Sequence, residues 1–387
     1  MRMRTYHFAL SSWLALVAAC SDSNQRSQPD GGGLDGSLGN AGVTVIDLGA
    51  VQTGQPTTLM IGEHVLGFHI VVTTDDSNIG TVGVDVIESP TGDKVLADDV
   101  PEGGVAPIGS SPYGVVAVSV PQTSSRAAMP IEAGAWTLTL SAPPGRTAHA
   151  KAYVRSSPDG EFHGGTLDVR IYIPDGLMIQ DPDAVHAITA AEASTDACVK
   201  ARVDSLFATL DQLFQLGRGK VEFVAIGSQF DSIPDDPTRL AALAETVAPA
   251  DGFAAHFVWT DGLTLFGNDV WANGSWVPGT STFAGHSLSG IAVDVSSGYP
   301  AAADGMTMVH ELGHFFGLFH TTELNRSFHD PLIDTPECAS SAAVCPDASN
   351  IMSPNFYGAT GGVGLEATAQ QRRVVWGSPI YTATPAP

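Results

Sequence analysis

The stretch from His310 to His320, with the sequence HELGHFFGLFH, holds the residues of this chain that are best suited to chemistry. An α-helix turns about 100° per residue, so His310 and His314 would share one face, about 6 Å apart along the axis. Two imidazoles in this arrangement can bind one metal ion, and Glu311 would lie beside that ion. The spacing therefore predicts a metal site with a carboxylate next to it.

His320 can join this site only if the helix ends before it. On a continued helix His320 would lie about 9 Å beyond His314, whereas zinc–nitrogen bonds are about 2 Å long. Gly317 allows the break, because glycine adopts the left-handed conformation that ends helices. Three histidines with one open position are typical of a catalytic zinc ion, since a structural zinc ion has a fourth protein ligand. We therefore expect one Zn2+ bound by His310, His314 and His320.

This set of groups predicts the hydrolysis of peptide bonds. Zinc lowers the pKa of a bound water to about 7, and Glu311 would accept the proton of that water and pass it to the leaving amine. An amide requires both a strong nucleophile and protonation of a poor leaving group, and this arrangement supplies both. A motif with five fixed residues arises by chance in on the order of 1 in 10,000 chains of this length, which favours a site over an ordinary core helix. The expected partner is a protein or peptide substrate.

The long motif resembles that of the metzincin zinc metalloproteases. The resemblance implies that Met352, within the sequence NIMSP, lies in a turn beneath the metal ion. The segment between the zinc-binding motif and Met352 is similar to that of pappalysin-type metzincins. It contains DPLIDTPEC, then CPD and NIM. Many such enzymes have tyrosine two residues after the methionine, where this chain has Pro354. The likeness covers residues 167–381 as an architecture, but its specific motifs occupy only residues 310–352.

The resemblance also suggests a second metal. Some pappalysin-like proteins bind calcium in this segment, and here Asp330, Asp334 and Asp347 are the candidate Ca2+ ligands. The alternative is a hydrated turn, because the spacing of these residues is not that of an EF-hand.

The elements that must position the zinc site follow from the pattern of residues 161–387. Apolar residues at steps of three and four predict a helix that begins near Val199 and that Gly217 ends. The order of strands and helices predicts a mixed α/β sheet of the metzincin type. Strands are expected at 167–173, 221–226, 254–259 and 290–295, and further helices at 237–247 and 365–376, the last with Arg372 and Arg373 facing outward.

Residues 43–160 show a different pattern, of short β-branched runs separated by turn residues. This pattern predicts an antiparallel β-sandwich, and the run PIEAGAWTLTL resembles the last strands of jelly-roll modules found in secreted bacterial peptidases. The expected strands lie at 43–48, 68–73, 81–87, 113–120, 135–142 and 148–154. His286, before the strand at 290–295, is expected near the edge strand that aligns substrate.

Residues 1–20 have the pattern of an export signal. Arg2 and Arg4 precede a short apolar run that ends in VAAC, which resembles the lipobox of bacterial lipoproteins. Cys20 would then carry the lipid, and residues 21–42 would form a flexible tether. We expect an exported protein, anchored to a bacterial membrane, on the periplasmic or cell-surface face of the outer membrane. The alternative is an ordinary signal peptide with a cysteine nearby.

Export permits disulfides, and three cysteines remain besides Cys20. Cys338 and Cys345 close a short loop beside the expected methionine turn, so we expect them to form a disulfide. Cys198 is expected to be a buried thiol on a helix. The alternative is a thiolate that blocks the zinc ion until activation.

Composition limits the remaining choices. A chain of 387 residues with 43% hydrophobic and 15% charged residues fits two folded domains and argues against a disordered or coiled-coil protein. The 41 acidic residues outnumber the 17 Lys and Arg, so nucleic acid is not an expected partner. We expect a monomer that contacts the membrane only through its lipid. The rival hypotheses are a catalytically silent zinc-containing surface binding or adhesion lipoprotein, against which the presence of Glu311 argues, and a zinc amidase that acts on non-protein amides.

Overall fold

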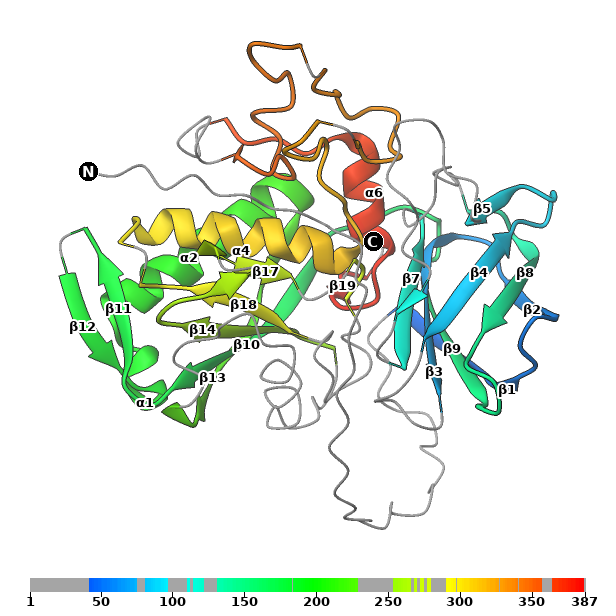
Figure 1. The fold of residues 1–387 in the computed structure, drawn as a ribbon, viewed down its shortest axis with the longest axis horizontal. Coiled ribbons are helices and arrows are strands. Elements are labelled where there is room, and N and C mark those ends of the chain that lie inside the picture. The colour runs from blue at the N-terminus through cyan, green and yellow to red at the C-terminus, as the bar shows by residue number, and fades with distance from the viewer. Residues whose placement is uncertain are drawn as a thin grey trace.

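A computed structural model of the chain is shown in Figure 1. The structure describes residues 42–74, 81–96, 110–111, 114–121, 131–182, 184–228, 253–265, 268–269, 272–274, 277–279, 290–296, 298–326, 328–339, 341–356 and 364–385. The expected export signal, Cys20 and most of the tether lie outside these residues, as do the expected helix at 237–247 and His286.

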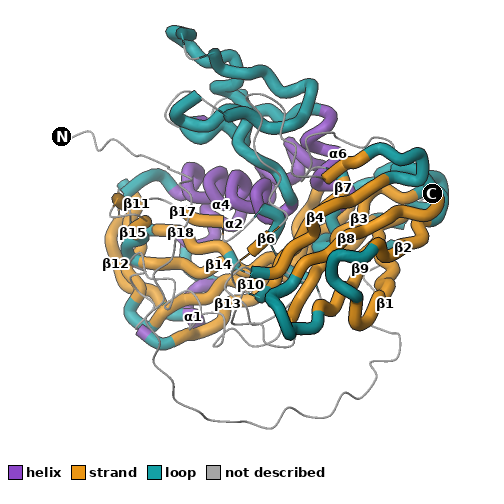
Figure 2. Tube along the Cα trace, turned by 45° about the vertical axis from the view of Figure 1, so that its right-hand side comes forward, coloured by secondary structure: helices purple, strands orange, loops and turns teal. Residues whose placement is uncertain are grey.

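The first part of the chain, residues 42–156, which we call the N-terminal lobe, consists of two antiparallel sheets (Figures 1 and 2). One sheet has the order β1 (Val43–Val51), β9 (Ala148–Ser156), β3 (Val65–Thr74) and β7 (Val115–Val120). The other has the order β2 (Pro56–Ile61), β8 (Gly134–Ser141), β4 (Val82–Glu88) and β5 (Lys94–Leu96), with β6 (Ser110–Ser111) paired to β4.

One hydrophobic core joins these two sheets. In β8 the side chains alternate, so that Trp136, Leu138 and Leu140 are fully buried while their neighbours are less so. They pack in the same core as Phe68 and Ile70 of the other sheet, and the ring of Trp136 lies edge-on to that of Phe68. Both sheets therefore bury one face against the other.

The second part, residues 165–383, which we call the C-terminal lobe, is built on a mixed sheet with the order β13-β10-β14-β18-β17. The pairs β10–β13, β10–β14 and β14–β18 are parallel, whereas β17 and β19 pair antiparallel with β18 and β10. These strands are β10 (Gly165–Pro174), β13 (Leu216–Ile226), β14 (Ala255–Thr260), β17 (Ala272–Gly274), β18 (Ile291–Asp294) and β19 (Thr382–Ala383). Two hairpins stand apart from it, β11 (Leu177–Asp181) with β12 (Ala184–Ile188), and β15 (Thr264–Leu265) with β16 (Asn268–Asp269).

Helices α2 (Ala197–Phe214) and α4 (Ala301–Phe316) run side by side along this sheet (Figure 1). Gly305 permits their close approach, because a Cβ atom there would lie 2.7 Å from the carbonyl oxygen of Arg202. The Arg202 guanidinium is fully buried and binds Asp304 of α4 at 2.8 Å and Asp181 of β11 at 3.2 Å. The remaining helices in the described part of the chain are α1 (Ala190–Ala193) and α6 (Ala369–Gly377). None of the described helices is long and apolar enough to span a bilayer.

The structure has strands at all the positions predicted for them, with some bounds shifted, and it corrects two details. The helix α2 ends at Gln215, whose φ is 57°, because β13 begins at the next residue; Gly217 is therefore already part of a strand. On α6, Arg373 is exposed but Arg372 is not directed outward, since its Nε donates to the carbonyl of Leu213 at 2.9 Å.

The two lobes meet at buried polar contacts. Arg155 of β9 is fully buried, and its guanidinium donates to the carbonyl oxygens of Ser378, Pro379 and Tyr381 while lying 4.2 Å from the Tyr381 ring centroid. Gly67 and Gly377 touch, since a Cβ atom on Gly67 would lie 2.6 Å from the Cα atom of Gly377.

The two ends of the described chain also lie at this contact between the lobes. A Cβ atom on Gly42 would lie 3.8 Å from that of Ala383, and the amide of Ser156 donates to the Gly42 carbonyl.

Candidate metal centre

The helix α4 carries the first two histidines in its last two turns and ends as expected. Gly317 follows its last residue with φ of 112°, in the left-handed region that glycine allows. The amide of Gly317 donates to the carbonyl of His314 at 2.9 Å, and that of Leu318 donates to the carbonyl of Gly313 at 2.8 Å. This pair of bonds is the Schellman arrangement that closes helix C-termini. The chain then turns back and brings His320 to the other two histidines.

The three imidazoles converge through their Nε2 atoms. The Nε2 atom of His320 lies 3.2 Å from that of His310 and 3.1 Å from that of His314. His310 and His320 are buried, with exposed fractions of 6% and 5%, while His314 is partly exposed. Sequence spacing predicted this meeting of residues ten positions apart.

Hydrogen bonds fix the tautomer of each ring. The Nδ1 atom of His310 lies 2.6 Å from the carbonyl oxygen of Ile351, and that of His314 lies 2.7 Å from the carbonyl oxygen of Leu318. The Nδ1 atom of His320 lies 3.0 Å from Oε2 of Glu323. A carbonyl or carboxylate oxygen can only accept, so each Nδ1 carries the proton in the neutral ring. Each Nε2 therefore presents a lone pair to the others.

Three lone pairs this close repel one another unless a cation lies between them, and a zinc ion fits. Donor atoms about 2.0–2.1 Å from one zinc ion in tetrahedral geometry are about 3.3–3.4 Å apart, close to the observed spacing. Burial, followed by the charge of His320, lowers the pKa of His310 to about 3 and that of His314 well below its usual value. The rings of His310 and His314 are therefore neutral at pH 7, as metal ligands must be.

Met352, which the resemblance places beneath the metal ion, packs against α4. It is fully buried, and its sulfur lies so near α4 that a Cβ atom on Gly313 would come within 2.3 Å of it. Gly313, one residue before His314, is required for this contact. Met352 also follows Ile351, whose carbonyl holds His310.

Two further side chains complete the immediate surroundings of the histidines. Glu311 follows His310 on α4 and is buried, with an exposed fraction of 5%. The ring of Phe356 stacks on that of His310, with centroids 5.3 Å apart. Sequence reasoning did not single out Phe356.

Glu323 is a site residue that the sequence did not reveal. Its carboxylate is the partner of His320, and although burial raises the pKa of Glu323, the charge and hydrogen bond of His320 outweigh burial and lower it. A carboxylate behind a ligand histidine orients the ring and increases its basicity. A spacing of three residues from His320 does not by itself indicate a contact, because the two side chains meet only through the turn that follows α4.

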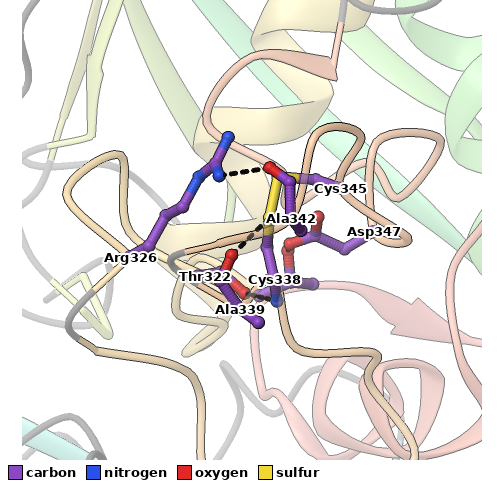
Figure 3. The surroundings of a disulfide bond; sticks show 8 residues. Thr322, Arg326, Cys338, Ala339, Ala342, Cys345 and Asp347 are labelled. Atoms are coloured by element: carbon purple, nitrogen blue, oxygen red, sulfur yellow. Dashed lines mark hydrogen bonds between the residues drawn. A yellow bond between two sulfur atoms is a disulfide. The ribbon is translucent and has the colours of Figure 1, made fainter.

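The loop after the site contains the expected disulfide, which joins Cys338 and Cys345 (Figure 3). The amide of Cys338 donates to the hydroxyl of Thr322 at 2.9 Å, and Arg326 donates to the carbonyl of Ala342 at 2.7 Å, across the same loop. These two hydrogen bonds attach the loop that the disulfide closes to the segment that follows His320. The sulfur atoms lie near Asp347 but are bonded to each other, so they are not free to bind metal.

The three aspartates proposed for calcium have separate surroundings. Both carboxylate oxygens of Asp334 accept hydrogen bonds at the start of α6, from the Thr368 hydroxyl and the Gln370 amide. Asp330 and Asp347 are buried, and each has one carboxylate oxygen without a hydrogen-bond partner among the described residues. Burial raises the pKa of Asp330 to about 8. The three do not form one cluster of metal-ligand atoms, and calcium binding stays a prediction.

Comparison with known proteins gives limited information. No family model matches the sequence, and no curated protein shows a significant match. Among solved structures, the chain is similar to an archaemetzincin from Methanopyrus kandleri, with 17% identity, a TM-score of 0.28, and coverage of 56% of this chain and 89% of that one. It is also similar to metalloproteinase-II from Bacteroides fragilis, with 11% identity, a TM-score of 0.27, and coverage of 46% of this chain and 55% of that one. TM-scores of this size do not establish a common fold.

Proposed function

We propose that this protein is a zinc-dependent endopeptidase in which Glu311 acts as the general base. The observation that carries the proposal is that Nε2 of His320 lies 3.2 Å from that of His310 and 3.1 Å from that of His314, while every Nδ1 is held by an acceptor. A cation between the Nε2 atoms stabilises this arrangement, because their lone pairs otherwise repel one another.

The residues of the chain have separate tasks in this proposal. His310, His314 and His320 would hold the zinc ion, which when bound makes a water more acidic and polarises the substrate carbonyl. Glu311 accepts the proton of the attacking water and delivers it to the nitrogen of the leaving amine. Glu323 and the carbonyls of Ile351 and Leu318 keep the imidazoles oriented.

The wider assignment is also a proposal. We assign the N-terminal lobe to a β-sandwich domain at residues 43–160 and the C-terminal lobe to a metzincin-type domain of the pappalysin-like branch at residues 161–387. The shared core of the two antiparallel sheets supports the first assignment, and the position of Met352 under α4 supports the second. The VAAC sequence supports export and lipid attachment at Cys20.

The function is tested by replacing Glu311 with glutamine, which keeps the size of the side chain but removes its basicity. We expect purified wild-type protein to bind about one zinc ion at the three histidines and to cleave an unfolded protein substrate. The Glu311→Gln variant should retain this zinc ion but lose at least about 100-fold in cleavage rate, since general base catalysis contributes 100-fold to 10,000-fold. Zinc content by mass spectrometry and the rate of peptide release are measured together.

Glu161→Gln, which changes an exposed carboxylate in the loop between β9 and β10, is the matched control and should cleave like the wild type. Cleavage by Glu311→Gln at the wild-type rate would contradict the role of Glu311 as base. Zinc binding without any cleavage by wild-type protein would favour the silent binding protein instead.

A further inference from the structure

A second group of metal-ligating side chains lies apart from the three histidines, where the hairpin β11–β12 meets the start of α2. It consists of His186 on β12, Asp196, which precedes α2, and Cys198 in the first turn of that helix. One potential ligand atom from each lies within 4.8 Å of the others. Figure 1 shows the hairpin at the edge of the C-terminal lobe farthest from the N-terminal lobe.

The local structure holds these side chains in place. Asp196 caps α2, because its Oδ1 atom accepts a hydrogen bond from the amide of Val199 at 2.9 Å. Its other oxygen, Oδ2, lies 2.8 Å from Nε2 of His186. The helix cap therefore fixes the carboxylate with one oxygen directed at the imidazole, and Cys198 follows two residues later. All three residues are partly buried.

The surroundings of the thiol are negative. Oδ1 of Asp181 is buried and has no hydrogen-bond partner among the described residues, while Oδ2 binds Arg202. Arg202 also binds Asp304, so one guanidinium faces two carboxylates, those of Asp181 and Asp304. The carboxylate of Asp196 lies nearby. Burial, and then the Asp181 and Asp196 carboxylates, raise the pKa of the Cys198 thiol to about 11. The same negative charge that keeps the proton on sulfur would attract a divalent cation.

We propose that His186, Asp196 and Cys198 form a second binding site for a divalent transition metal ion of the zinc type. One nitrogen, one oxygen and one sulfur donor suit the borderline-soft ions Zn2+ and Co2+ and not Ca2+ or Mg2+, which prefer oxygen alone. Donors around one tetrahedral zinc ion lie about 3.3–3.7 Å apart, so the present separations require only small side-chain rotations. On binding, the sulfur–hydrogen bond breaks, a sulfur–metal bond forms, and the thiol proton is released to solvent. The proton that Nε2 of His186 donates to Asp196 moves to Nδ1 through solvent, so that Nε2 can bind the metal.

This site is independent of the proposed peptidase function. It shares no residue with the three-histidine centre, and it differs from that centre in having a sulfur donor. The difference gives the two sites different spectra when Co2+ replaces zinc. Thiolate ligation adds an intense charge-transfer band in the near ultraviolet, whereas histidine ligation alone gives only weak bands in the visible range.

In the experiment the metal-free full chain is titrated with Co2+, and binding is monitored by the absorption spectrum. We expect wild-type protein to bind about two cobalt ions per chain and to show both the near-ultraviolet band and the visible bands. Cys198→Ser, close to isosteric, should bind about one ion and lose the near-ultraviolet band while keeping the visible bands. Cys20 is the same in both proteins, and Cys338 and Cys345 are in a disulfide, so the difference belongs to Cys198.

Two further variants make the test specific. His186→Gln should shift the near-ultraviolet titration to at least about 10-fold higher Co2+ concentration, because one of three ligands is lost. His163→Gln is the matched control, since His163 forms a similar pair with Asp159 at 2.9 Å and is not part of the cluster. It should leave both bands unchanged.

The proposal is overturned if wild-type protein shows no near-ultraviolet band with two equivalents of Co2+, or if Cys198→Ser keeps that band. If wild-type protein binds only about one cobalt ion and the near-ultraviolet band is present in it but lost in Cys198→Ser, the three-histidine centre is contradicted and the second site is supported.

Discussion

At the scale of single residues, each ligand histidine has an acceptor behind it, but the acceptors differ. His310 and His314 face backbone carbonyls, whereas His320 faces the carboxylate of Glu323. The histidines could be predicted from the sequence because helix geometry relates residues four apart and a glycine allows the turn. Their partners could not, because the positions of Glu323 and Ile351 depend on how distant segments pack.

Glu323→Ala tests the carboxylate behind His320. We expect zinc affinity to fall about 10-fold to 100-fold, because the ring loses the group that orients it and increases its basicity. Glu323→Gln, which keeps an acceptor without the charge, should lose less. Competition with a chromophoric chelator measures the affinity.

Glu337→Ala is the control for this change, because Glu337 is exposed and forms a similar pair with His329, 3.3 Å apart, that is not part of the three-histidine group. Equal zinc affinities for the Glu323→Ala and wild-type proteins would show that Glu323 has no part in metal binding.

At the scale of the elements, α4 connects the metal centre to the rest of the C-terminal lobe. Its early residues contact α2 at Gly305, and its last turns contact the Met352 turn at Gly313. The predicted helices and strands follow from hydrophobic periodicity, which is local. The short strand β17 and the hairpin β11–β12 were not predicted, since their pairing depends on partners and turns that periodicity does not show.

Gly313→Ala tests the contact between α4 and the Met352 turn. Helix propensity alone would favour alanine by about 1 kcal/mol, but the added methyl group would overlap the Met352 sulfur, and overpacking costs about 1–3 kcal/mol. We expect a net loss of up to about 2 kcal/mol in the free energy of unfolding, measured with urea.

The double variant Gly313→Ala, Met352→Ala provides the control through a mutant cycle. If the clash is the cause, the two changes together should cost at least about 1 kcal/mol less than their separate costs combined. If the stability costs of the two single variants simply add up in the double variant, the loss caused by Gly313→Ala does not come from contact with Met352.

At the scale of the whole molecule, the two lobes are joined by buried polar contacts as well as by the chain. The proposed division at residue 160 falls between β9 and β10, but Arg155 of β9 is surrounded by residues 378–381. Composition and turn residues could place the boundary, whereas the contact across it involves residues more than 220 positions apart.

Arg155→Met tests this junction. Methionine cannot donate to the carbonyls of Ser378, Pro379 and Tyr381, which would stay buried without their present donor. We expect the free energy of unfolding to fall by about 2–4 kcal/mol. Arg373→Met, on the exposed side of α6, is the matched control and should change it by less than about 0.5 kcal/mol. Similar stabilities for the two variants would contradict the role of Arg155.

Stability should also depend on pH through His69 in the N-terminal lobe. His69 is buried, its Nδ1 lies 3.0 Å from the Ser119 hydroxyl, and burial lowers its pKa from 6.5 to about 4. The folded state favours the neutral ring, so this stabilisation is fully present above about pH 6.5 and is lost as the pH falls towards 4. A shift of this size corresponds to at most about 3 kcal/mol.

Urea unfolding of wild type and His69→Gln at pH 7 and pH 4.5 measures this effect. The wild type should lose more stability than the variant between the two pH values, whereas His149→Gln, which changes an exposed histidine of β9, should behave like the wild type. An equal loss in the His69→Gln protein would contradict the assignment.

The meeting of Gly42 and Ala383 has a consequence for how the chain can be rebuilt. A short linker could join these two positions, and new ends could be opened in the turn between β11 and β12, without cutting either core. Such a circular permutant should keep the three histidines together, and a label attached at Gly42 or at Ala383 would report from the same point beside Arg155.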